Sequence, residues 1–138
     1  MSQKPDPLSL LPIFADLSKA DLKKVARLMT ETVIKEGKNL VTEGTVGREV
    51  FVVRDGRATV RKGSRVIASV GAGDVVGEGS LISGEPRSAT VTADTEMTVE
   101  VLDRREFSSL LEEFPGIARK ILAATMRHLH SVDPSVAH

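Results

Sequence analysis

The residues best suited to chemistry lie between positions 76 and 91, where a glycine–acid pair precedes a proline–arginine pair. Gly77 and Glu78 open a helix-sized run, and Pro86 and Arg87 lead from that run into a strand-like segment. A guanidinium neutralises a phosphate with two parallel, charge-assisted hydrogen bonds. A carboxylate accepts a hydrogen bond from a sugar hydroxyl. The segment therefore predicts a site for a small ligand with a phosphate at one end and a hydroxyl at the other.

The residues that follow the glycine–acid pair suit the same ligand. Gly79, Ser80 and Leu81 would present backbone N–H groups at the start of a short helix, which is a natural site for an anion. Pro86 would restrict the loop before Arg87, so that less conformational entropy is lost when the arginine engages the ligand. These features point to binding rather than to bond cleavage, because no nucleophile and base are paired.

Each of these residues also has a simpler interpretation. Glu78 and Arg87 could form only a salt bridge at the rim of a barrel. Gly77 and Gly79 could serve only as turn residues. Ser88, which follows the arginine, is nearly as well explained by a surface hydroxyl as by a ligand contact. The two interpretations differ in whether these residues gather around one cavity.

The central part of the chain must position this segment, and its pattern is that of short strands. Between Thr32 and Leu102, runs rich in Val, Ile and Thr alternate with breaks that contain Gly. The segments 50–54 and 57–61, joined by Asp55-Gly56, predict a β-hairpin, because Asp-Gly supplies the positive φ angles of a tight turn. Many short strands at this spacing predict a barrel or a jelly roll.

Helical spacing of apolar residues flanks this region on both sides. The pattern predicts one helix over about 18–30, which begins at a capping residue, and two more over 104–114 and 117 to about 130. Residues 1–10 are expected to form a flexible arm, and residues 131–138 a disordered tail. The sequence thus predicts a mainly β fold with flanking helices.

Composition excludes several classes of function. The 138 residues suffice for one domain with a core of its own. Nineteen Lys plus Arg balance nineteen Asp plus Glu, so bulk charge gives no reason to expect nucleic acid or a membrane surface as a partner. No apolar run reaches the roughly 18 residues of a membrane span. The chain has no Cys, which is compatible with a reducing, cytoplasmic location.

The histidines argue against a metal enzyme. His128, His130 and His138 are the only ones, and all lie near the C-terminal end. A metal-dependent enzyme on a β-roll, such as a cupin, would need histidines inside the barrel. His128 and His130 are two residues apart and would not share a helix face. We therefore expect no metal site and no enzymatic activity.

The segment 76–91 resembles the phosphate-binding cassette of cyclic nucleotide-binding domains. The resemblance rests on Gly77-Glu78 and on the run Pro86-Arg87-Ser88-Ala89-Thr90-Val91 at the family's spacing. It extends over about 11–130 and includes Glu43-Gly44, Gly73-Asp74 and Phe107. It implies an eight-stranded, jelly-roll-like β-roll with an N-terminal helix and two C-terminal helices.

The resemblance also implies which residues contact a cyclic nucleotide. Valines of the strands would contact the base, and a residue of the last helix, Met126, Arg127 or His128, would close over it. Ser88 stands where a Thr more usually favours guanine, so cAMP is preferred over cGMP. The implied ligand residues are Gly77, Glu78, Gly79, Ser80, Leu81, Arg87, Ser88, Ala89, Val60, Val70 and Val91.

Three positions depart from the family pattern. Gly79 and Ser80 replace the usual Leu and Ala, and Val76 stands where a larger residue is common. Gly79 makes a short helix less stable by roughly 1 kcal/mol relative to Ala. These departures support an alternative function, in which a degenerate member of the fold serves as a protein-interaction module without nucleotide.

The resemblance implies a regulatory sensor that acts on a separate effector. Ligand binding would reorder the C-terminal helices and so act on an effector protein or on a fused effector domain beyond this chain. The ligand, cAMP or cGMP, is the only small molecule expected, and no cofactor is implied. The stripe of Ile117, Ile121, Ala124 and Leu129 is either core or the seam of a homodimer formed through the last helix.

Overall fold

The computed structural model describes residues 7–131, with the side chains of residues 8–123. Within this range eight strands form two four-stranded antiparallel sheets, ordered β1-β8-β3-β6 and β2-β7-β4-β5. The predicted eight-stranded, jelly-roll-like β-roll is therefore confirmed. Its strands are β1 (Thr30–Ile34), β2 (Asn39–Val41), β3 (Glu49–Asp55), β4 (Ala58–Lys62), β5 (Arg65–Val70), β6 (Val75–Val76), β7 (Thr90–Ala93) and β8 (Met97–Asp103).

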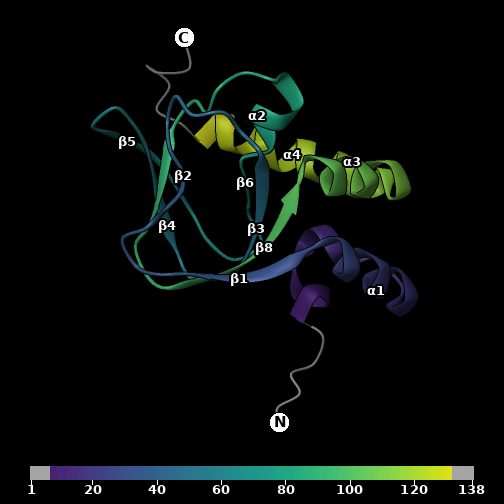
Figure 1. Cartoon of the computed structure of the whole chain (residues 1–138). Coiled ribbons are helices and arrows are strands. Elements are labelled where there is room, and N and C mark those ends of the chain that lie inside the picture. The colour runs from purple at the N-terminus through teal and green to yellow at the C-terminus, as the bar shows by residue number, and fades with distance from the viewer. Residues whose placement is uncertain (1–6, 132–138) are drawn as a thin grey trace.

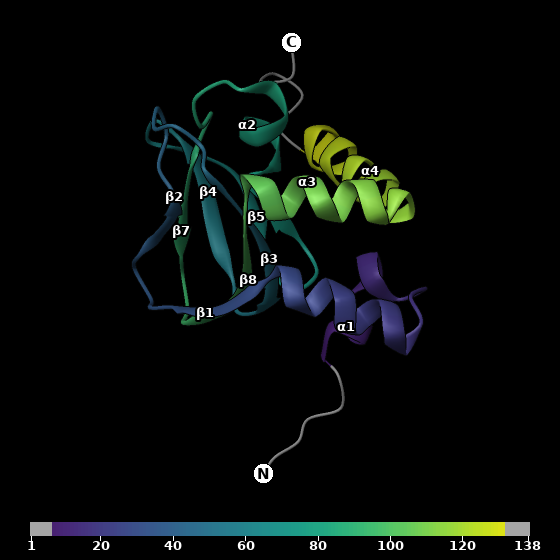
Figure 2. The same ribbon diagram turned by 45° about the vertical axis from the view of Figure 1, so that its right-hand side comes forward.

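The helices lie on one side and at one end of the roll (Figure 1). Those that cover the side of the β1-β8-β3-β6 sheet come from both ends of the chain, whereas α2 interrupts the strands between β6 and β7 and lies at the end of the roll. Figure 2 shows the same division from a second direction. The elements are η1 (Pro7–Leu10), η2 (Pro12–Phe14), α1 (Lys19–Leu28), α2 (Glu78–Ser83), α3 (Arg104–Glu113) and α4 (Pro115–Ser131).

Strand β3 separates the two apolar cores of the molecule. Phe51 and Val53 face the interior of the roll, whereas Val50 and Val52 pack with the helices. Alternate residues of a strand point to opposite faces of its sheet. A strand covered on both faces therefore has an unbroken apolar run instead of an alternating pattern.

The predicted N-terminal helix is present as α1, whereas part of the predicted flexible arm is structured. Ser18 caps α1 by accepting a hydrogen bond from the backbone N–H of Asp21, with 3.1 Å between Oγ and N. Residues Pro7–Leu10, which we expected in the arm, form η1, and Leu8 is buried in the helix-side core. The buried side chain of Leu8 anchors this turn, and such 3₁₀ turns are short.

The predicted hairpin at Asp55-Gly56 is wrong. Strand β3 pairs with β8 and β6, whereas β4 pairs with β5 and β7, so Asp55-Gly56 carries the chain from one sheet to the other. Gly56 has a φ of +95°, and a Cβ there would lie 2.6 Å from the Glu96 carbonyl oxygen. The Asp-Gly pair therefore does form a tight turn, as predicted. A local turn does not specify which strands pair, however, so the predicted pairing failed. The two-residue hairpin lies between β4 and β5 instead, where Lys62 and Arg65 are partners.

The two C-terminal helices follow the predicted boundaries to within two residues. Asp103 and Glu106 form a reciprocal capping box at the start of α3, with 2.8 Å from N to O in each hydrogen bond. The helix ends at Glu113, and Pro115 begins α4, since proline suits the first position of a helix. Ile117 and Ile121 are buried in the helix-side core. Ala124 and Leu129, the rest of the predicted stripe, have side chains outside the described residues.

Candidate ligand cavity at the end of the roll

A cavity of about 410 Å³ lies between α2 and the inner faces of the strands. Every predicted ligand residue except Leu81 lines it, although these residues come from distant parts of the chain. Its volume lies within the range of small-molecule sites. The simpler interpretation of the cassette residues, as unrelated surface and turn positions, does not account for this convergence.

Arg87 is the central charged group of this cavity. Only 7% of the residue is exposed, and its guanidinium donates to two backbone carbonyls, of Gly77 at 2.8 Å and of Glu49 at 2.7 Å. Among the described residues, no carboxylate forms an ion pair with it. Burial lowers the pKa of Arg87, and the charges of Glu49 and Glu78 oppose that effect. Because arginine stays protonated in proteins, the cavity wall carries a buried positive charge whose hydrogen-bond partners, among the described residues, are backbone carbonyls.

The turn before α2 allows this arrangement. Gly77 caps the helix in the left-handed region, with a φ of +93° that favours glycine. A Cβ at this position would lie 2.6 Å from Nη1 of Arg87 and 3.0 Å from the Glu49 carbonyl oxygen. The lack of a side chain at Gly77 therefore leaves room for the guanidinium of Arg87. Glu78 follows as the first residue of α2 and is buried.

The loop between β2 and β3 holds the arginine from its backbone side. The N–H of Arg87 donates to the Thr45 carbonyl, and the N–H of Gly44 donates to the Arg87 carbonyl, both at 2.8 Å. Ser80 donates from Oγ to the Glu85 carbonyl at 2.5 Å, which closes the loop after α2. These hydrogen bonds therefore order the cassette and hold the guanidinium beside the cavity.

The strands supply an aliphatic wall opposite the arginine. Val60 and Val41 are both strand partners of Val91, so these three valines form a row across the sheet. Val70 and Ala89 line the same cavity, as does Ser88, which is exposed. Six further residues line the cavity that were not among the predicted ligand residues: Val41, Val75, Val76, Ser83, Glu85 and Pro86. The row Val41–Val91–Val60 depends on strand register, which the sequence does not reveal.

Two groups of predicted contacts lie elsewhere. Leu81 does not line the cavity; its side chain is buried in the helix-side core. The candidates for closing over the base, Met126, Arg127 and His128, fall within α4 but have side chains outside the described residues.

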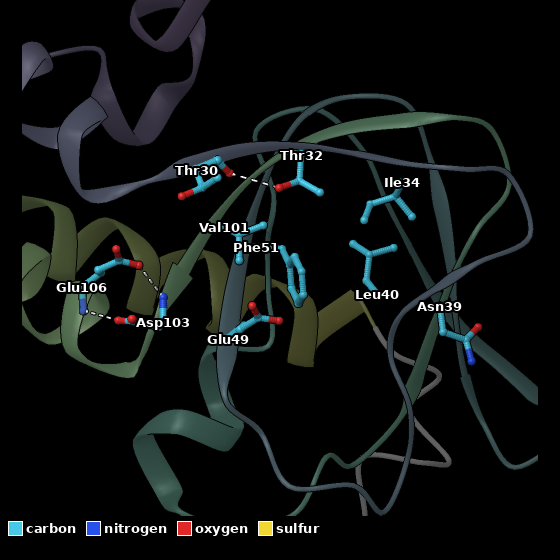
Figure 3. Close-up of a pocket in the computed structure, with 10 residues that line it drawn as sticks. All are labelled: Thr30, Thr32, Ile34, Asn39, Leu40, Glu49, Phe51, Val101, Asp103 and Glu106. Carbon is cyan, nitrogen blue, oxygen red and sulfur yellow. Dashed lines mark hydrogen bonds between the residues drawn. The ribbon is translucent and has the colours of Figure 1, made fainter.

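A second cavity, of about 510 Å³, opens on another side of the roll (Figure 3). Figure 3 shows Glu49 and the Asp103–Glu106 pair on one side of it and the apolar Ile34 and Leu40 on the other. Three carboxylates would repel an anion. The smaller cavity at Arg87 is therefore the better site for a phosphate.

Two further findings concern only the described residues. None of their His, Asp and Glu side chains form a cluster of three or more that could hold a metal ion. No helix in this part of the chain combines the length and apolarity that crossing a membrane requires.

The fold and the cavity together define a class of protein: a β-roll with flanking helices, in which a buried arginine and a short helix line a cavity at the end of the roll. Residues 31–114 match the family described as "Cyclic nucleotide-binding domain". The chain belongs to this family, and it is a cyclic nucleotide-binding regulatory domain.

Relatives of known function support this assignment. A cyclic nucleotide-gated potassium channel from Rhizobium etli is 35% identical over 114 residues, which cover 83% of this chain and 32% of the channel. A cAMP-dependent protein kinase regulatory subunit from Yarrowia lipolytica is 34% identical over 130 residues, which cover 93% of this chain and 32% of the subunit. The chain thus spans about a third of the length of each of these relatives.

Solved structures share the fold. A structure described as Sp-2Cl-cAMPS bound to PKAR CBD2 has a TM-score of 0.77 and 30% identity, and the match covers 91% of this chain and 86% of that one. The catabolite activator protein of Thermus thermophilus has a TM-score of 0.75 at 24% identity, with 86% of this chain and 58% of that one covered. The second likeness concerns the fold alone.

Proposed function

We propose that the cavity at Arg87 binds cAMP in preference to cGMP and that the domain acts as a regulatory sensor without catalytic activity. The observation that supports this most is the buried guanidinium, whose only partners among the described residues are carbonyl oxygens. A singly charged phosphate would compensate this charge, at a side chain that is itself largely removed from solvent.

In this proposal each part of the cyclic nucleotide meets a different part of the cavity. The phosphate accepts from Arg87 and from the backbone N–H groups at the start of α2. The 2′-hydroxyl donates to Glu78, which is buried beside the arginine. The base lies against the row of valines, whose apolar side chains do not distinguish between purines. Ser88 adds one hydroxyl, which permits a guanine without requiring it.

Leu81 would transmit the effect of ligand binding from α2 to the C-terminal helices. This residue lies in α2, and it belongs to the same buried cluster as Phe107 of α3 and Ile117 of α4. A cassette that tightens around a phosphate shifts Leu81, and α3 and α4 repack because a close-packed core does not deform continuously. The ligand changes this equilibrium only to the extent that it binds one helix arrangement better than the other. The effector, or a second copy of the domain that pairs through α4, would respond to the new arrangement.

Titration calorimetry with cAMP and then cGMP tests the proposal. We expect saturable binding of about one nucleotide per chain, with the higher affinity for cAMP. A higher affinity for cGMP would reverse the assigned role of Ser88. Absence of heat with both nucleotides at millimolar concentration would reject the proposal. It would favour the alternative, a protein-interaction module in which Gly79 and Ser80 have weakened the nucleotide site.

A further inference from the structure

An open hollow of about 540 Å³ lies beside the cassette, outside the nucleotide cavity. The loop between β2 and β3 forms one side of it and the first turn of α3 forms the other. Its lining residues are Val46, Gly47, Arg48, Asp103, Arg104 and Arg105. Three of these six residues are arginines, although the chain as a whole has no net charge. The hollow therefore concentrates positive charge at one place on the surface.

These arginines are not neutralised by their neighbours. No carboxylate in the described part of the chain forms an ion pair with Arg48, Arg104 or Arg105. Asp103 also lines the hollow, but one oxygen of its carboxylate accepts from the Glu106 N–H as the cap of α3. The lining residues therefore carry three positive charges and one negative charge, a net charge of +2, and none of the three arginines is ion-paired within the described residues.

Large apolar side chains are exposed next to this charge. Val46 in the loop is 67% exposed, and Ile82 in α2 is 66% exposed. Arg104 lies between their segments, since its Nη2 is 3.3 Å from the Gly47 carbonyl oxygen and its Nη1 is 3.4 Å from the Leu81 carbonyl oxygen. Exposed apolar residues bordered by arginine are typical of protein-binding surfaces, where arginine is enriched and often contributes much of the affinity.

We propose that Val46, Arg48, Ile82, Arg104 and Arg105, here called the arginine surface, bind an acidic segment of a partner protein. The carboxylates of the partner would pair with the three arginines, and an apolar side chain of the partner would cover Val46 and Ile82. Charge complementarity selects this occupant, because a neutral or basic segment would leave the arginines desolvated and unpaired.

The arginine surface is joined to the nucleotide cavity through Gly47. A Cβ at Gly47 would lie 2.3 Å from Oγ of Ser80 and 3.1 Å from Cζ of Arg87, so the loop is in direct contact with the cassette. A partner that moves this loop therefore acts on Arg87, and a nucleotide that moves Arg87 acts on the loop. By linkage, each ligand must change the affinity of the other by the same factor. This coupling rests on the proposed function, whereas the docking surface does not.

The surface is tested by fluorescence anisotropy with a labelled peptide of Glu-Glu-Leu-Glu repeats, compared with the same peptide carrying Gln for Glu. We expect saturable binding of the Glu peptide alone. The double variant Arg48→Glu with Arg105→Glu should weaken it by at least about tenfold. Arg57→Glu with Lys62→Glu changes the net charge equally, far from the hollow in sequence, and should leave binding within about twofold. Equal effects of both variants, or no saturable binding at millimolar peptide, would overturn the docking surface.

Two further measurements separate the surface from the nucleotide site. In amide NMR spectra the Glu peptide should shift signals of residues 46–48, 82 and 104–105 and leave 57–62 unchanged; the reverse pattern would also overturn the surface. With saturating cAMP the peptide affinity should change by at least about threefold in the wild type. If cAMP binds by calorimetry and the peptide affinity does not change, the coupling is wrong. If cAMP does not bind but the peptide does, the proposed function fails and the docking surface stands.

Discussion

Two arginines of this domain are largely removed from solvent, and their guanidinium groups have different kinds of partner. Arg54 in β3 forms ion pairs with Glu100 and Glu31, the latter at 3.4 Å, and its side chain is 16% exposed. Arg87 is 7% exposed, and its guanidinium has carbonyl oxygens as partners in place of carboxylates. Both residues lie in a small domain whose formal charges sum to zero.

This difference in partners distinguishes an arginine that stabilises the fold from one that is available to bind a ligand. A buried cation paired with carboxylates has its charge compensated within the protein, and an added anion would have to displace them. A buried cation held by dipoles is oriented without being neutralised, so an added anion is favoured. The comparison predicts that Arg54 contributes to stability and Arg87 to affinity, and each of the variants below tests one side of it.

Arg54→Ala should have the largest effect, on the free energy of unfolding. Glu100 is 5% exposed and would lose its cation, and breaking a largely buried ion pair costs about 3 kcal/mol. Urea denaturation should show this loss as a lower midpoint, while calorimetry should give a nucleotide affinity within about threefold of wild type. Arg57→Ala, at an exposed arginine, is the control and should stay within about 0.5 kcal/mol. A large loss of affinity in Arg54→Ala would break the comparison.

Arg87→Ala should lower the affinity for cAMP by at least about tenfold, or about 1.4 kcal/mol, because the phosphate loses its charged partner. The fold should survive at a cost of about 1 kcal/mol for each carbonyl left without its donor, those of Gly77 and Glu49. Calorimetry measures the affinity, and circular dichroism checks the fold.

The control for this variant is Arg87→Lys, which keeps the charge and removes the forked geometry. Its affinity should fall between those of the wild type and Arg87→Ala, because an ammonium pairs with phosphate as a point charge. If Arg87→Ala binds cAMP as tightly as the wild type, the phosphate does not lie at Arg87, and the proposed function loses its main support.

Two glycine variants should change affinity in opposite directions, within the same cassette. Gly79→Ala places its Cβ where no atom lies within 4 Å, and it favours the helical state of α2 by about 1 kcal/mol. A preformed α2 should bind cAMP up to about fivefold more tightly. Gly47→Ala places its Cβ 2.3 Å from Oγ of Ser80, so Ser80 or the loop must move and binding should weaken several-fold. Calorimetry on both variants checks the pair; a weaker Gly79→Ala would show that α2 must stay flexible.

The cavity was largely predictable from the sequence because its polar residues are contiguous. Gly77 to Arg87 lie within one short stretch, and local spacing alone brings the acid, the helix start and the arginine to one end of the roll. The presence of many short strands and the helix boundaries followed from turn residues, caps and apolar period, which are also local signals, whereas the count of eight strands came from the family resemblance.

What the sequence missed depends on pairing between distant segments. The corner at Gly56 could not be distinguished from a hairpin, because the same Asp-Gly pair serves a turn within a sheet and a crossover between sheets. The contact of Gly47 with Ser80 and Arg87 joins two loops that no periodic pattern connects. The Arg54–Glu100 pair spans two strands whose register the sequence does not give, so neither residue was singled out.

Glu100 provides the test with the smallest expected effect. Its titration reports on Arg54, whose charge is already paired within the protein. Burial raises the pKa of Glu100, the Arg54 hydrogen bond and charge lower it, and the nearby Glu31 raises it; the net direction is upward. The folded state therefore binds more protons than the unfolded state. The stability that Glu100 contributes is complete below its unfolded pKa and is lost as pH rises through the higher folded pKa.

Glu100→Gln should remove this pH dependence, because glutamine still accepts from Arg54 but does not titrate. The difference in free energy of unfolding, wild type minus variant, should fall as pH is raised from about 4 to 7. Urea denaturation across that range measures it, and cAMP affinity at pH 7 should be unchanged. A difference that rises with pH would mean that the ion pair outweighs burial in setting the Glu100 pKa. Arg54 would then stabilise the charged carboxylate more than desolvation penalises it, and the contrast with Arg87 would be sharper than the present geometry indicates.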